Sequence, residues 1–71
     1  ECDLVLTRAN VPEISVEIKY SSAPKVNKGL RTSIEDLGTS QNYIICLTDH
    51  EFPIAKNIIA CNLEEFIKNH L

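Results

Sequence analysis

Three residues near the start of the chain have the types and spacing of a metal-dependent phosphodiesterase site. Asp3 lies in the first apolar stretch, and Glu17 and Lys19 lie two residues apart in the second. Two carboxylates bind a hard cation such as Mg²⁺ or Mn²⁺ through oxygen and leave positions for water and phosphate. A lysine beside them can orient or deprotonate the attacking water and stabilise transition-state charge. The pattern predicts Asp3 and Glu17 as metal ligands, with the Ile18 carbonyl as a third oxygen, and Lys19 as the catalytic residue.

A β-hairpin is the element that must position these residues. Residues 2–8 and 13–20 are rich in β-formers, and residues 9–12, which include Asn10 and Pro12, separate them. A register in which paired residue numbers sum to 20 buries the apolar residues of both strands together. It also places Asp3, Glu17 and Lys19 on one solvated face. The apolar face of the second strand is expected to carry Ile14, Val16, Ile18 and Tyr20.

The rest of the chain predicts a βαβ unit and a closing helix. A helix is expected between an N-cap at Asn27 and Gly38, and a buried strand over 42–48 should run parallel to the second strand. Residues 49–53 are expected to form a loop and 58–61 a further strand, and Asn62 should cap the last helix. We therefore expect one α/β (α+β) domain over 1–71 with a small mixed sheet. The buried stripe of the first helix is Val26, Leu30, Ile34 and Leu37, and that of the last is Leu63, Phe66, Ile67 and Leu71.

Composition narrows the function classes. Seven Lys and Arg against ten Asp and Glu give a net charge of −3, which argues against a module that coats nucleic acid. A local basic edge of Lys25, Lys28 and Arg31 could still meet a phosphate backbone, although these residue types are common on any exposed helix face. No apolar run approaches the roughly 20 residues that span a bilayer. We expect no membrane association.

The cysteines and histidines suggest no site of their own. Cys2, Cys46 and Cys61 are widely spaced in apolar settings, which favours reduced, buried thiols in a cytoplasmic protein over a zinc site. His50 and His70 are isolated, and we expect both at the surface. The chain contains no Met and opens at Glu1 inside a predicted strand, so we expect a fragment of a longer protein.

With these elements in place, the sequence resembles a known fold. Asp3, then Glu17-Ile18-Lys19 in a hairpin, then a helix and a parallel strand, are similar to the second half of the PD-(D/E)XK nuclease-like, or restriction-endonuclease-like, core. The segments 1–6, 16–21 and 24–30 resemble a family of nuclease-like domains of unknown function found at the C-terminus of bacterial and archaeal AAA-type ATPases. The resemblance implies that ATP binds only in an upstream module, because no GxxxxGK[ST] motif occurs here. It also implies a further strand and helix before Glu1, the helix often supplying another acidic ligand.

Two functions follow as hypotheses. The first is metal-dependent cleavage or binding of DNA or RNA by the three-residue site. The second is a catalytically silent module that docks on its own ATPase module or another subunit, in which case the same three residues form a solvated face with cross-strand charge pairs. Self-association is compatible with both hypotheses.

Overall fold

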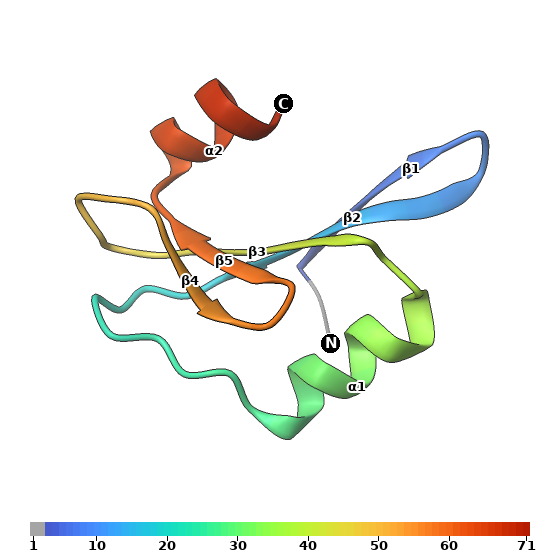
Figure 1. Ribbon diagram of the computed structural model, residues 1–71, viewed down its shortest axis with the longest axis horizontal. Coiled ribbons are helices and arrows are strands. Elements are labelled where there is room, and N and C mark those ends of the chain that lie inside the picture. Colours follow the sequence, from blue (N-terminus) through green and yellow to red (C-terminus); the bar gives the residue numbers. More distant parts are fainter. Residues whose placement is uncertain (1–2) are drawn as a thin grey trace.

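The chain forms a five-stranded mixed sheet with one helix on each face (Figure 1). A computed structural model describes residues 3–71. Across the sheet the strand order is β1-β2-β3-β5-β4, which confirms the predicted small α/β mixed sheet. The elements are β1 (Leu4–Arg8), β2 (Val11–Ile18), α1 (Lys28–Leu37), β3 (Gln41–Ile45), β4 (Phe52–Ala55), β5 (Ile58–Cys61) and α2 (Leu63–His70).

The hairpin β1–β2 has the predicted register. Leu4 pairs with Val16 and Leu6 with Ile14, so the paired numbers sum to 20, up to a register shift after Leu6. The turn is shorter than expected and consists of Ala9 and Asn10, which both have positive φ. Such a two-residue turn matches the right-handed twist of the strands, and it lets Val11 and Pro12 join β2.

Helix α1 connects two parallel strands and ends where the sequence predicts. The Asn27 side chain accepts a hydrogen bond from the Leu30 amide, and Gly38 adopts the left-handed conformation with φ 69° and donates its amide to Ile34. Glycine reaches this conformation without the steric cost of a Cβ. Strand β3 then returns parallel to β2, as a right-handed crossover predicts.

The far edge of the sheet contains a strand that the sequence does not predict. Strand β4 occupies part of the expected loop and pairs antiparallel with β5, which is the predicted further strand. Pro53 lies within β4, and a proline normally argues against a strand because it has no amide hydrogen to donate. Its place in an edge strand, beside a register shift before Ala55, explains why the structure tolerates it.

Two apolar clusters form the core, one on each face of the sheet. On the α1 side, Leu30 packs with Ile44, Cys46, Ile58 and Ala60. On the α2 side, Phe66 packs with Val16, Tyr43 and Cys61. The predicted α1 stripe is confirmed for three of its four residues, since Leu30 is buried and Val26 and Ile34 pack against its cluster. Leu37, in the last turn of the helix, is only partly buried and lies outside this cluster.

The two faces of β2 differ from the expectation. Ser15, which alternation puts on the same face as Glu17, is buried, whereas Ile18 and Tyr20, expected on the apolar face, are 59% and 93% exposed. The reason is that β2 lies inside the sheet between β1 and β3, with helices on both faces, so its middle is covered on both sides. Alternation identifies the two faces of a strand but not which of them a helix covers.

Helix α2 has the predicted cap but buries less than expected. The Asn62 side chain accepts a hydrogen bond of 2.7 Å from the Glu65 amide. Phe66 alone in the helix is buried. The prediction of a buried stripe is wrong for three of its four residues, because an eight-residue helix lying on a narrow sheet contacts it along one side. The exposed residues are Leu63, Ile67 and Leu71.

The two described cysteines are free and buried, as predicted for Cys46 and Cys61. Cys2 lies outside the described residues. Neither helix of the described chain has the length and apolar character needed to cross a bilayer.

Candidate functional site

The structure brings Asp3 beside the Glu17–Lys19 segment. The Asp3 amide donates to the Val16 carbonyl at 3.1 Å, and the Ile18 amide donates to Asp3 Oδ2 at 2.8 Å. Regular strand pairing begins at Leu4 and Val16, and these two bonds hold Asp3 beside the next residues of β2, Glu17 and Ile18. The Asp3 carboxylate thus closes the end of the hairpin and keeps its second oxygen, Oδ1, free of that bond.

Glu17 occupies an unusual environment for a carboxylate. It pairs with Ile44 of β3 in the parallel register and therefore shares the α1 face of the sheet. Its side chain is only 19% exposed. Oε1 is buried without a hydrogen-bond partner, and it is the one side-chain atom in this condition among residues 3–71.

Lys19 is the nearest cation to this carboxylate. Its Nζ lies 3.7 Å from Glu17 Oε2, and its side chain is 26% exposed. The Lys19 amide donates to the Ile45 carbonyl at 2.9 Å, which fixes the backbone at the carboxyl end of β2. Ligands of α/β proteins bind preferentially at the carboxyl ends of parallel strands.

The donor set fits a hard divalent cation in part. A buried carboxylate oxygen without a partner costs free energy, and a cation bound there would remove that cost. Asp3 and Glu17 supply two carboxylates from neighbouring strands. The described part of the chain holds no group of three or more His, Cys, Asp or Glu side chains placed to share a metal ion. A cation held here would complete its coordination with main-chain oxygen and water.

The three predicted nucleic-acid residues remain available. Lys25, Lys28 and Arg31 are exposed, and none of them forms an ion pair with another residue in the range 3–71. Lys28 opens α1 and Arg31 lies in its first turn, so both belong to the helix that covers the Glu17 face. Their contact with phosphate stays a prediction.

Comparison with known proteins places this chain in a family. The sequence matches a family described as "Domain of unknown function (DUF4143)" over residues 1–66. The chain belongs to the DUF4143 family. No curated protein and no solved structure matches it significantly. The DUF4143 match spans Asp3, Glu17 and Lys19 as well as the three basic residues, but its description includes neither nuclease activity nor an ATPase context.

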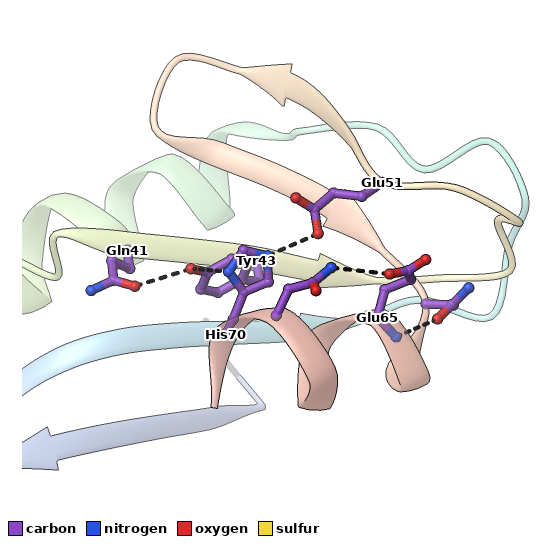
Figure 2. A network of polar contacts seen from close by, with 7 residues as sticks. Gln41, Tyr43, Glu51, Glu65 and His70 are labelled. Atoms are coloured by element: carbon purple, nitrogen blue, oxygen red, sulfur yellow. Dashed lines mark hydrogen bonds and ion pairs between the residues drawn. The ribbon is translucent and has the colours of Figure 1, made fainter.

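The DUF4143 chain contains a second polar cluster that sequence reasoning missed. Figure 2 shows Tyr43 of β3, Glu51 from the loop before β4 and His70 at the end of α2 pointing toward one another. His70 Nε2 lies 2.8 Å from Glu51 Oε1, and His70 Nδ1 lies 3.1 Å from the Tyr43 hydroxyl. The hydroxyl donates to Gln41 Oε1 at 3.0 Å. The cluster ties three separate elements together.

The predicted surface position is confirmed for His50 and wrong for His70, whose side chain is 16% exposed. His70 follows Phe66 by four residues and therefore lies on the buried side of α2. Its ring lies 4.5 Å from the ring of Tyr43, and Phe66 meets Tyr43 edge-on. The spacing from Phe66 is the sequence signal that could have revealed this position.

Burial controls the ionisation of this region. Desolvation raises the pKa of Tyr43, and the charges of Cys61 and Glu51 add to the effect. The Cys61 thiol is buried beside Glu51, Cys46 and Glu65, and mainly its burial raises its pKa to about 11. Tyr43 and Cys61 are therefore neutral at physiological pH, and Cys61 is not an activated nucleophile.

Proposed function

We propose that this DUF4143 domain is nuclease-like and binds Mg²⁺ or Mn²⁺ through Asp3 and Glu17 to act on a phosphodiester of DNA or RNA. The observation that carries the proposal is the buried, unpartnered Oε1 of Glu17, which lies beside a lysine and next to Ile18, whose amide binds the Asp3 carboxylate. The arrangement of hairpin, helix and parallel strand that underlies the PD-(D/E)XK resemblance supports it. We propose further that the domain belongs to an AAA-type ATPase whose nucleotide binds in an upstream module.

The chain's own residues have distinct roles in this proposal. Glu17 is held by the sheet in a half-buried position, where its charge is poorly solvated and attracts a cation. Asp3 is fixed at Oδ2 by the Ile18 amide and offers its other oxygen, Oδ1, from the residue just before β1. Lys19, at the carboxyl end of β2, stabilises negative charge on a phosphate or holds the proton of the attacking water. When bound, the divalent ion would supply Lewis-acid stabilisation of the phosphoryl oxygens.

Metal binding by the chain tests this function directly. Millimolar Mn²⁺ should raise the melting temperature of the wild-type chain, because a ligand that binds only the folded state stabilises it by mass action. Glu17→Ala should abolish the rise. Glu13→Ala is the matched control, because Glu13 lies on the same strand but pairs with Arg8 at the hairpin end, and the rise should persist. A wild-type chain that shows no rise, or a Glu17→Ala chain that retains it, contradicts the proposal.

Catalysis needs a separate measurement. Any plasmid nicking that depends on Mn²⁺ should disappear in Lys19→Ala, while the circular dichroism spectrum and the metal-induced rise in melting temperature remain. Nicking that survives this substitution comes from another site or from a contaminant.

A second candidate function is the catalytically silent module, and one observation favours it. Glu17 and Lys19 already form an ion pair, and Asp3 already accepts a main-chain hydrogen bond. In this case the three residues stabilise the hairpin, and Leu4 and Ile18, which are exposed on the sheet, contribute to a surface that docks on the ATPase module. Thermal melts that do not respond to Mg²⁺ or Mn²⁺ would favour this function over the first.

A further inference from the structure

Helix α2 presents an apolar stripe to solvent. Leu63, Ile67 and Leu71 follow one another at four-residue intervals and are 57%, 53% and 72% exposed. Residues four apart lie on the same side of a helix. The buried side of α2 carries Phe66 and His70 instead, so the exposed stripe is a second apolar side of a short helix.

Opposite charges flank this stripe one turn apart. Glu64 and Lys68 line the same shallow hollow as Leu63 and Ile67. Within the described chain neither Glu64 nor Lys68 has an ion-pair partner. The hollow thus carries an acid toward the start of the helix and a base toward its end.

We propose that a second copy of this chain packs on the exposed stripe of α2, with the two helices antiparallel about a two-fold axis. Reversing a copy of α2 brings its Lys68 beside Glu64 and its Glu64 beside Lys68, so both ion pairs form at once. The same operation sets Leu63 of one helix against Ile67 and Leu71 of the other. A two-fold contact buries the same patch on both copies, which requires a self-complementary surface. The reversed charge order provides that property.

The helix is held in place before any partner arrives. At its start the Asn62 side chain accepts the Glu65 amide, and at its end His70 contacts both Tyr43 and Glu51 (Figure 2). A surface that is already rigid loses little conformational entropy on binding. The contacts among Tyr43, Glu51 and His70 (the Tyr43 cluster) therefore fix the position of the exposed stripe before a partner binds.

The association state of the chain tests the proposal. Sedimentation equilibrium at micromolar to millimolar concentration should show a monomer–dimer equilibrium. Ile67→Asp should weaken the dimer by about tenfold or more, because a charge would face an apolar contact. Val11→Asp is the matched control, since Val11 is also exposed but lies at the hairpin end, and its dimer should be unchanged. Circular dichroism of each variant verifies that it folds.

A charge-swap experiment distinguishes the antiparallel arrangement from any other contact. Glu64→Lys gives a chain with two lysines at the patch, and Lys68→Glu gives a chain with two glutamates, so each variant alone should dimerise poorly. An equimolar mixture should dimerise at least as well as wild type, because every cross-interface pair is then of opposite sign.

Three outcomes would overturn the proposal. They are a wild-type chain that is monomeric at millimolar concentration, an Ile67→Asp dimer as strong as that of wild type, and a charge-swap mixture that associates no better than its components. Binding of a separately produced ATPase module to the stripe of a monomeric chain would assign the surface to that partner instead. Neither the metal response nor nicking is involved in these measurements, so they fail or succeed independently of the proposed function.

Discussion

Replacing Glu17 by Met should stabilise the metal-free chain. Removing a buried carboxylate ordinarily destabilises a protein, because it leaves the charged partner of that carboxylate buried without a counter-charge. Glu17 differs because Oε1 has no partner, while Oε2 has only Lys19 at 3.7 Å. Methionine is unbranched, has a similar length and has no charged group to solvate.

The magnitude follows from two opposing contributions. Removing an unsatisfied buried oxygen recovers about 1–3 kcal/mol. Losing the ion pair costs about 0.2–1 kcal/mol, because Lys19 is partly exposed and can reach water. The free energy of unfolding should therefore rise by about 1 kcal/mol, which corresponds to an increase in melting temperature of about 4–8 °C for a domain of this size.

Thermal melts with EDTA in the buffer measure this change. Glu13→Met is the control, because Glu13 forms an exposed ion pair with Arg8, so its loss should lower the melting temperature slightly or leave it unchanged. A lower melting temperature for Glu17→Met would refute the reasoning, since it would mean that Glu17 stabilises the fold through Lys19. That result would favour the silent module over the metal site.

Three further predictions concern the rest of the chain. The pKa of Cys61 rises from 9.0 to about 11 on folding, so its contribution to stability is complete below pH 9 and about 2 kcal/mol is lost between pH 9 and 11. Urea titrations across this range should show the loss. Cys61→Ala should make it smaller by that amount, while Tyr43 and Cys46, whose pKa values burial also raises, continue to contribute. Asn42→Ala should lower the free energy of unfolding in urea by about 2–3 kcal/mol, because the buried Ser15 hydroxyl and the Asn57 carbonyl both lose their partner; a loss below about 0.5 kcal/mol would contradict this. His70→Ala should speed hydrogen exchange of the α2 amides, and unchanged exchange would show that the contacts with Tyr43 and Glu51 do not hold the helix.

Local signals in the sequence were sufficient to predict most of the elements. Asn27, Gly38 and Asn62 mark helix ends because their side chain or backbone satisfies groups that a helix leaves unpaired, and this chemistry acts within four residues. The parallel pairing of β3 with β2 was also predictable, because a strand, a connecting helix and a second strand of the same sheet ordinarily form a crossover between parallel strands. Strand β4 was missed because Pro53 opposes strand formation locally, whereas its position at the sheet edge is set by the distant pairing with β5.

The candidate site was predictable in its residues but not in its environment. The hairpin brings Asp3 beside Glu17 and Ile18, and alternation puts Lys19 on the same face as Glu17. Whether that face is exposed to solvent depends on where α1 packs, and no local sequence pattern indicates this. The sequence therefore does not predict the burial of Glu17. The Tyr43 cluster joins residues 19 and 27 positions apart, and pairs of that separation carry no periodic signal.

The two edge strands of the sheet, β1 and β4, differ in how readily a further strand could pair with them. On one side β4 is four residues long, contains a register shift and includes a proline without an amide hydrogen. On the other side β1 is five residues long, contains no proline, and has no strand on its outer side among residues 3–71. Any polypeptide that lengthens this sheet by hydrogen bonding is therefore expected to add beside β1. Such an addition would run past Asp3, and its side chains would be placed to complete the coordination of an ion bound there.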